Sequence, residues 1–320
     1  MSDYKGVVGT AVVNVAGDPP APLEGELWYN SSTLSFKIYK TSVAGAWATG
    51  GNLNNARSSL GGGGTQTSAL AFGGSPGTAN KTESYNGTSW TNKNNMNTAR
   101  DQFGDAGTSN TNALAFGGFL DPGVGDITES WNGTNWTEVN DLNIAKFGMA
   151  GCGSNTAALS FAGVDPPDFV VHTEIWNGTN WTEVNNLNTA RTELAGTGTT
   201  TSALAFGGRS STDVTELWNG TNWTEVNDLN TAREYLRGSG ANNTAALAFG
   251  GEVDPGITGA TEKWNGTNWT VVTAMSTGRS RSAAAGTNTA ALCFGGSTPD
   301  TTAATEEFNS PALKTETITS

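Results

Sequence analysis

The sequence predicts an all-β fold built from six copies of one four-stranded unit, and three observations support this prediction. A block of about 45 residues recurs six times, and each copy opens near a basic residue and carries a double glycine, Ala162-Gly163 in the third copy. The second glycine of this element returns at intervals of 43 to 45 residues. No copy has a helix-period apolar face of useful length. A fixed period of this size, filled with short strand-like runs, is typical of a propeller.

The copy at residues 191–226 divides into four short strands separated by turn residues. The predicted strands are 195–198, 203–206, 215–218 and 222–226. Asn219-Gly220 lies between the last two, and this pair suits a tight hairpin turn that needs positive φ. Four antiparallel strands in each copy correspond to one blade of a β-propeller.

Four spaced elements recur together: the double glycine, the aromatic residue that ends the third strand, the Trp of the fourth strand, and an Asn-Leu-Asn-Thr-Ala-Arg segment. Together they resemble the kelch family of β-propellers over roughly residues 45–309. The resemblance implies four-stranded blades that close into a ring, and six repeats imply six blades.

The two ends of the repeat region indicate how such a ring closes. The last copy has a third strand at 305–309, and no fourth strand follows it. Residues 46–50 and 52–57 match the end of a copy whose beginning is absent. The N-terminal strand is therefore predicted to be the outer strand of the sixth blade, which closes the ring without a long free sheet edge.

Two charged series run through the copies, one basic and one acidic. They are Arg57, Arg100, Lys146, Arg191, Arg233 and Arg279, and Glu83, Glu129, Glu174, Glu216, Glu262 and Glu306. Opposite charges repeated in every blade predict partly buried structural ion pairs, with a catalytic role as the alternative. Lys146 lacks the two-pronged guanidinium, so we expect its blade to have the weakest contact. The repeated aromatic residues are interpreted as core, with sugar stacking as the alternative.

Composition and charge exclude several classes of partner. A net charge of −13 argues against nucleic acid and anionic membranes. No apolar run is long enough for membrane insertion, and the N-terminus lacks a secretory signal pattern. Two cysteines, Cys152 and Cys293, with the lone His172 cannot form a zinc site of the usual type. Carboxylates of the variable loops could bind calcium, but no loop has a recognisable calcium-binding spacing, and no metal and no cofactor are predicted.

Enzymatic activity is not expected. Copper oxidases of the kelch class use histidine ligands and a tyrosine linked to cysteine, and one histidine does not supply that set. A sialidase needs arginines clustered at the propeller axis. The arginines outside the repeated series, Arg209, Arg237 and Arg281, are interpreted as scattered.

Binding is predicted on the face that carries the loops after the double glycine. These loops differ from copy to copy, whereas the Asn-Gly turns of the opposite face repeat closely. The alternative is that they are ordinary variable loops. The candidate binding residues are Asp121, Asp126, Asp165, Asp168, Phe169, His172, Arg209 and Asp254.

Residues outside the repeats predict three further segments: a docking arm at 1–23, a hairpin or connector at 24–44 and a C-terminal tail at 310–320. The segments 25–30 and 36–39 resemble a hairpin of bacteriophage tail and fibre proteins. The layout of hairpin and repeats resembles virion proteins from phages of marine bacteria. Glu26-Leu27-Trp28 is also similar to a third strand, so whether it competes with 306–309 for the third-strand place in the last blade stays open.

These resemblances predict a non-enzymatic virion structural protein, made in the host cytoplasm and present in multiple copies on the particle. Its arm would contact other virion proteins, and its propeller would attach to a host-surface glycan or protein. One alternative is a capsid or tail decoration (cement) subunit without receptor binding. Another is a cellular kelch adaptor that binds a protein partner.

Overall fold

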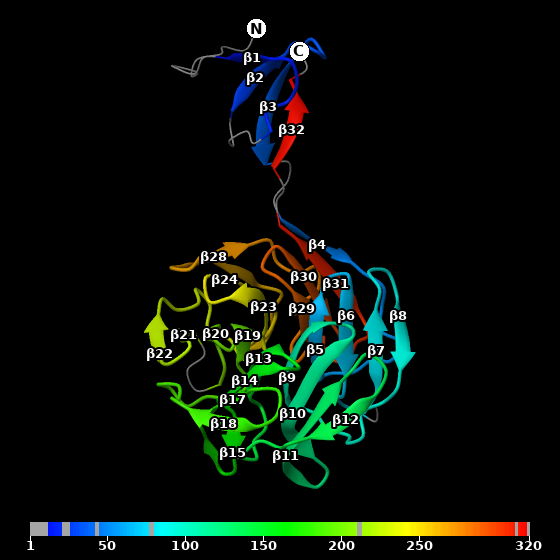
Figure 1. Cartoon of the computed structure of the whole chain (residues 1–320), viewed down its shortest axis with the longest axis vertical. Coiled ribbons are helices and arrows are strands. Elements are labelled where there is room, and N and C mark those ends of the chain that lie inside the picture. Colours follow the sequence, from blue (N-terminus) through cyan, green and yellow to red (C-terminus); the bar gives the residue numbers. More distant parts are fainter. Residues whose placement is uncertain are drawn as a thin grey trace. The chain divides into compact units, whose positions relative to one another are not determined.

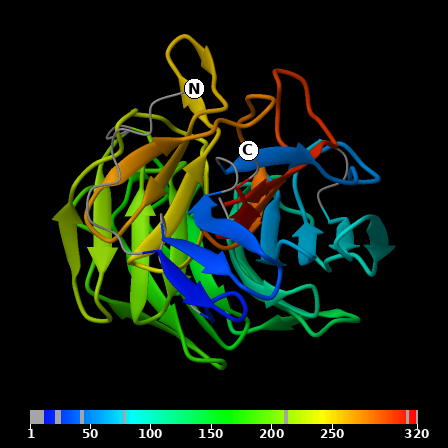
Figure 2. The ribbon, with the colours of Figure 1, turned by 90° about the horizontal axis from the view of Figure 1, so that it is seen from above.

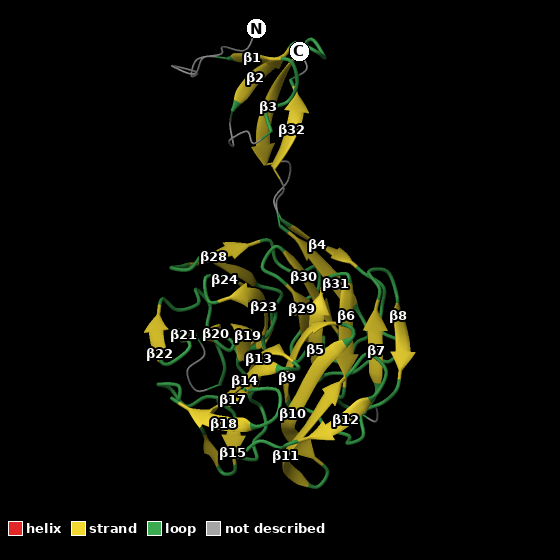
Figure 3. Cartoon of the chain, in the orientation of Figure 1, coloured by secondary structure: helices red, strands yellow, loops and turns green. Residues whose placement is uncertain are grey.

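The computed structural model describes residues 12–20, 26–41, 45–76, 80–209, 213–310 and 313–318. All regular elements of this part of the chain are strands, as Figure 3 shows. The chain divides into two compact units: a terminal unit of residues 1–46 and 310–320, and a repeat unit, Trp47–Asn309. Within the described residues no helix could span a membrane. The predicted all-β class is confirmed.

The described part of the repeat unit contains six four-stranded sheets. The first three sheets are β5 (Gly61–Thr65), β6 (Ser68–Phe72), β7 (Thr82–Tyr85) and β8 (Trp90–Lys93); β9 (Gly104–Ser109), β10 (Asn112–Leu120), β11 (Gly123–Trp131) and β12 (Trp136–Val139); and β13 (Ala150–Ser154), β14 (Ala157–Phe161), β17 (Thr173–Trp176) and β18 (Trp181–Val184). Two short hairpins extend from this framework, β15 (Val164–Asp165) with β16 (Asp168–Phe169) and β25 (Glu252–Val253) with β26 (Gly256–Ile257).

The other three sheets repeat the same plan. They are β19 (Ala195–Thr199), β20 (Ser202–Phe206), β21 (Thr215–Trp218) and β22 (Trp223–Val226); β23 (Arg237–Asn242), β24 (Ala245–Phe249), β27 (Thr261–Trp264) and β28 (Trp269–Val272); and β29 (Ala283–Gly286), β30 (Ala290–Phe294), β31 (Thr305–Asn309) and β4 (Ala46–Thr49). In the last sheet the N-terminal β4 lies beside β31. Neighbouring strands in the first five sheets pair antiparallel.

Local sequence explains why these strands begin and end where they do. The Ala-Leu-Ala-Phe residues of the second strands are fully buried and form the apolar centre of each sheet. Five of these strands end where the double glycine adopts positive φ, at 66° and 106° for Gly207 and Gly208, whereas β10 continues through its double glycine with a shift of register. The side chain of Asn219 accepts hydrogen bonds from the backbone of Thr221 and Asn222, which holds the turn between β21 and β22.

The first strand of each sheet lies nearest the centre of the repeat unit, and the fourth strands lie at its perimeter (Figure 1). The first strands contact one another in chain order, β5 with β9, β9 with β13, β13 with β19, β19 with β23 and β23 with β29; β29 in turn contacts β5. Small residues fill these strands, because a side chain at Gly62 or Gly151 would collide with neighbouring backbone. The arrangement of the sheets is propeller-like.

A cycle of backbone hydrogen bonds links the segments that enter the six sheets. The members are Ser59, Gln102, Gly148, Glu193, Tyr235 and Arg281, each two residues after a basic residue of the repeated series. Each N–H donates to the carbonyl of the preceding member, and Ser59 donates to Arg281 at 2.8 Å. All six residues have φ between 50° and 63°. Five residues with side chains therefore adopt a conformation that favours glycine.

The repeated tryptophans of the fourth strands are buried and connect neighbouring sheets. Each indole N–H donates to the repeated threonine of the third strand of the preceding sheet, and Trp90 in the first sheet donates to Thr305 in the sixth at 3.1 Å. Each ring also packs against a phenylalanine of the preceding sheet, such as Phe294 beside Trp90. These side chains stabilise the contacts between sheets.

The two charged series meet as six ion pairs with almost no solvent exposure. The distances are 3.1 Å for Arg57–Glu83, 2.5 Å for Arg100–Glu129, 3.7 Å for Lys146–Glu174, 3.2 Å for Arg191–Glu216 and 2.9 Å for Arg233–Glu262, and Arg279 pairs with Glu306. The second oxygen of each carboxylate accepts hydrogen bonds as well. In Glu216, for example, this oxygen accepts from the backbone N–H and the side-chain amide of Asn188. The carboxylates are thus compensated where they are buried.

The terminal unit contains one sheet with the strand order β1 (Val13–Val15), β2 (Leu27–Asn30), β3 (Ser35–Thr41) and β32 (Leu313–Thr317). The predicted docking arm, hairpin and tail therefore share a sheet, and part of the tail is a strand paired with β3. Residues 1–11, 21–25, 42–44, 311–312 and 319–320 of those segments lie outside the described residues. β2 pairs with β1 and β3, whereas β31 occupies the third place in the last sheet of the repeat unit.

Candidate functional site

The loops that follow the second strands start from the same end of every sheet, and we call the surface they form the variable face. Its described loops are 73–76, 80–81, 117–127, 162–172, 207–209, 213–214, 250–260 and 295–304. Figure 2 shows the β25–β26 hairpin and the red-orange loop after β30 projecting on the same side of the repeat unit. All eight predicted binding residues lie on loops or hairpins of this face.

Five of these residues lie on the second and third sheets. Asp121 and Asp126 are exposed on the β10–β11 hairpin. Asp165 and Asp168 are exposed and opposite each other in β15–β16, and Phe169 follows, 38% exposed. No hydrogen bond or ion pair of these four carboxylates is found within the described residues.

His172 has a different environment from the other predicted binding residues. It is half-buried, and its carbonyl oxygen accepts hydrogen bonds from the backbone of Ala162 and from the ammonium group of Lys146 at 3.2 Å. Its backbone thus supports the buried ion pair of the third sheet.

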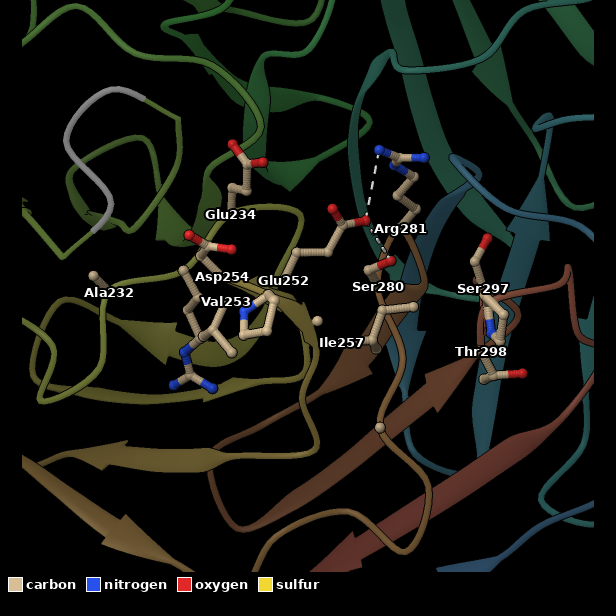
Figure 4. Close-up of a pocket in the computed structure, with 15 residues that line it drawn as sticks. Ala232, Glu234, Glu252, Val253, Asp254, Ile257, Ser280, Arg281, Ser297 and Thr298 are labelled. Carbon is tan, nitrogen blue, oxygen red and sulfur yellow. Dashed lines mark hydrogen bonds and ion pairs between the residues drawn. The ribbon is translucent and has the colours of Figure 1, made fainter.

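The other two predicted residues, Arg209 and Asp254, lie near a hollow on this face. This hollow has a volume of about 1150 Å³. Figure 4 shows Glu234 and Asp254 on one side of it, Ser297 and Thr298 on the opposite side, and Glu252 with Arg281 between them. Val253, Pro255, Ile257 and Pro299 add apolar surface to its lining.

Two Arg–Glu pairs hold the polar groups at this hollow. Glu252 accepts a hydrogen bond from the hydroxyl of Ser280 at 2.9 Å and lies 3.5 Å from the guanidinium of Arg281. Glu234, another residue of the lining, pairs with Arg209 at 3.1 Å. These four side chains keep exposed surface, from 21% for Glu234 to 54% for Arg209, so part of their hydrogen-bonding capacity remains available to a ligand.

The structure corrects the prediction that Arg209, Arg237 and Arg281 are scattered. The guanidinium of Arg281 lies 4.0 Å from the ring centroid of Tyr235, and that of Arg209 lies 5.8 Å from the same ring. Arg237 and Arg281 both line a small cavity with Tyr235. Cation–π attraction and nearby glutamates offset the repulsion between the arginines.

That small cavity, about 10 Å³, is lined by five of the six members of the hydrogen-bonded cycle. Burial raises the pKa of Glu193 there to about 7, although Arg237, Arg281 and Arg209 oppose the shift. Burial likewise raises the pKa of Asp105 to about 6 against the attraction of Arg237. Two carboxyl groups at the centre of the repeat unit therefore titrate well above their usual range.

Several residues around the hollow and the small cavity were missed by sequence reasoning. They are Glu193, Glu234, Tyr235, Arg237, Glu252, Ser280, Arg281, Ser297 and Thr298. One signal was present: the two positions after each repeated basic residue differ from copy to copy, and the second of them reads Ser, Gln, Gly, Glu, Tyr and Arg. Such variation within a repeat marks a place where function can differ between repeats.

No group of three or more His, Cys, Asp or Glu side chains that could hold a metal ion occurs within the described residues. Cys152 and Cys293 are buried thiols, and burial raises the pKa of both, to about 12 for Cys152. Neither a protein-family model nor a curated protein matches the chain. Its fold and site define an all-β protein with a propeller-like set of four-stranded sheets and a polar hollow on one face.

Proposed function

We propose that the chain is a non-enzymatic structural protein of a bacteriophage particle, and that its repeat unit is a kelch-like propeller of six blades that attaches the particle to the host surface. The observation that carries this proposal is the division of the chain. Both ends belong to the terminal unit, and the variable face belongs to the repeat unit. This division separates a base for docking on other virion proteins from a module for recognition.

Six blades closed into a ring by β4 are supported by contacts between the first and last sheets. Gly296 in the last sheet donates its N–H to the carbonyl of Arg57 at 2.9 Å, as the corresponding glycines do between neighbouring sheets. Two other series of bonds also connect the sixth sheet to the first as they connect neighbouring sheets: the indole N–H of Trp90 donates to Thr305, and the backbone N–H of Ser59 donates to Arg281. A closed ring of blades has only short outer edges, which suits a protein displayed in multiple copies.

Attachment through the variable face is supported by the contrast between the two faces. The hairpins β10–β11, β15–β16 and β25–β26 differ in sequence, while the Asn-Gly turns between third and fourth strands repeat. Loops on a rigid framework are the usual place for recognition. Several copies on one particle would convert a weak single contact into useful avidity.

The test uses particles assembled with variant chains. Deleting residues 1–23 should abolish incorporation into particles, while the thermal unfolding of the repeat unit persists. The change Gly256→Trp should leave incorporation intact and reduce adsorption to host cells, because Gly256 lines the hollow and an added Cβ there meets no atom within 4 Å.

The outcomes separate the alternatives. Absence of the chain from purified particles would favour a cellular adaptor. Normal incorporation together with normal adsorption by Gly256→Trp particles would favour a decoration subunit without receptor binding.

A further inference from the structure

The hollow between the fifth and sixth sheets presents donors and acceptors side by side. The carboxylate of Glu252 lies 3.5 Å from the guanidinium of Arg281, and the side chains of the two residues are 30% and 39% exposed. The hydroxyl of Ser280 donates one hydrogen bond to this carboxylate and orients it. A ligand group that both donates and accepts can bridge such a pair, donating to the carboxylate and accepting from the guanidinium. Vicinal hydroxyl groups have this property.

The remaining lining fits the same chemistry. Ser297 and Thr298 add polar groups on one side, and Asp254 on the other forms no ion pair within the described residues. Val253, Ile257 and the two prolines provide apolar surface that can pack against carbon-bound hydrogens. A ligand that combines dense hydroxyl groups with C–H surface would use both parts of the lining.

Charge argues against an acidic ligand. The hollow is lined by three carboxylates, those of Glu234, Glu252 and Asp254. The exposed guanidinium groups of Arg209 and Arg281 already pair with two of them. Since the whole chain carries a net charge of −13, a second set of negative charges would be repelled on approach and poorly compensated when bound.

We infer that this hollow binds an uncharged glycan segment, with vicinal hydroxyls bridging Glu252 and Arg281 and a sugar face packed on the Val253–Ile257 wall. The inference rests on the proposed attachment function and adds the ligand class and the place of binding. The glycan would occupy the hollow and would not contact the predicted Asp165–Phe169 hairpin.

The experiment titrates the purified full chain by calorimetry with maltohexaose, mannohexaose, an N-acetylglucosamine oligomer of equal length and an oligogalacturonate of equal length. We expect saturable binding of at least one uncharged oligosaccharide and none of the oligogalacturonate. Glu252→Gln should weaken that binding about tenfold, as expected for the loss of one charge-assisted hydrogen bond. Gly256→Trp should abolish it by placing a bulky side chain in the hollow.

Two matched variants serve as controls, and all variants are compared by thermal unfolding. Gly256→Ala changes the same position without filling the hollow, and Glu225→Gln changes an exposed carboxylate on the fourth strand β22. Both should bind within about twofold of the wild type. Equal weakening by Glu225→Gln and Glu252→Gln would overturn the assignment to the hollow, as would binding of the acidic oligosaccharide alone.

A cell-binding arm separates this inference from the proposed function. Host cells are treated either with periodate, which cleaves vicinal diols, or with protease. Loss of binding after periodate only supports the glycan. Loss after protease only, with no uncharged oligosaccharide bound at millimolar concentration, overturns the ligand class and leaves host attachment standing. Absence of binding to untreated host cells, with a folded chain, overturns both.

Discussion

The ammonium nitrogen of Lys146 lies 3.7 Å from Oε1 of Glu174, whereas the guanidinium nitrogen of each of the other five pairs lies at most 3.2 Å from the equivalent oxygen. Oε1 of Glu174 is also the one glutamate oxygen of these pairs that lacks a hydrogen bond in the described structure. The third sheet therefore has the weakest of the six contacts.

Replacing this lysine should stabilise the protein. We expect Lys146→Arg to raise the free energy of unfolding by about 1 kcal/mol, because the guanidinium can reach the unsatisfied oxygen. Urea denaturation measures the change, and Arg191→Lys in the next sheet is the matched reverse substitution, expected to destabilise. A lower stability of Lys146→Arg would show that the site has no room for the larger head group.

The same residue predicts a pH dependence. Burial lowers the pKa of Lys146 to about 8, below its ordinary value of 10.5, against the attraction of Glu174. The unfolded chain then binds more protons than the folded chain between these values, so stability contributed at this site rises with pH from about 8 to 10.5. Burial lowers the pKa of the equivalent guanidinium groups of Arg57 and Arg191 only to about 10, so the Lys146→Arg variant should lack the rise in urea midpoint between about pH 8 and 10. Parallel profiles for the two proteins would contradict the prediction.

Breaking a buried pair should cost far more than replacing it. Glu216→Ala leaves the buried guanidinium of Arg191 without its partner and should destabilise by about 3–5 kcal/mol. The double variant Arg191→Met with Glu216→Leu should be less destabilised than Glu216→Ala alone, because no buried charge remains. Chemical denaturation of the three proteins provides the comparison. A double variant less stable than the single one would mean that the backbone contacts of Arg191 matter more than the charge.

The raised pKa of Glu193 predicts stability lost as the pH increases. Its folded pKa of about 7 exceeds the ordinary value of 4.5, so the folded chain holds the proton more tightly. The contribution of this group is fully present below about 4.5 and is lost as the pH rises through about 7. Glu193→Gln should therefore show a smaller loss of urea midpoint between these pH values than the wild type, and identical losses would rule out this role for Glu193. Asp105, with its pKa raised to about 6, remains in both proteins and does not affect the difference.

Contacts between the first and last sheets should contribute measurably to stability. The hydroxyl of Tyr85 in β7 donates to Glu307 in β31 at 2.6 Å, and burial together with this bond raises the pKa of Tyr85 to about 12. Tyr85→Phe should lower the free energy of unfolding by about 1–2 kcal/mol, measured by urea denaturation. Tyr29→Phe in the terminal unit provides the control. Equal stability of Tyr85→Phe and the wild type would mean that solvent replaces the bond at no cost.

Much of the fold could be predicted from the chain because each repeat is a local unit. The predicted strand 215–218 is β21 itself, and 203–206 and 222–226 differ from β20 and β22 by one residue at the start. Alternating apolar residues, double glycines and Asn-Gly turns act within a few residues of their own position. No local pattern predicted the strand β32 within the tail at 310–320, because β32 is stabilised by pairing with β3, far away in the sequence.

The candidate site was only partly predictable, and for the same physical reason. Arg209 and Asp254 were recognised as members of variable loops, but the partners of Arg209, Glu234 and Tyr235, come from the segment that leads into the next sheet. Glu252 and Arg281 are 29 positions apart in the chain and meet because two neighbouring sheets bring them together. No local sequence pattern predicts that these two side chains lie close together in space.

By itself, therefore, the sequence determined the all-β class, the repeated four-stranded sheets and the two charged series, because period, turn chemistry and burial are properties of short segments. Only the tertiary structure decided that Arg209 and Arg281 lie beside the ring of Tyr235, that Glu193 and Asp105 are half-buried at the centre, and that a polar hollow opens beside Glu252. These features depend on the distances and burial created when sheets pack together, and side chains from separate repeats acquire their chemistry there.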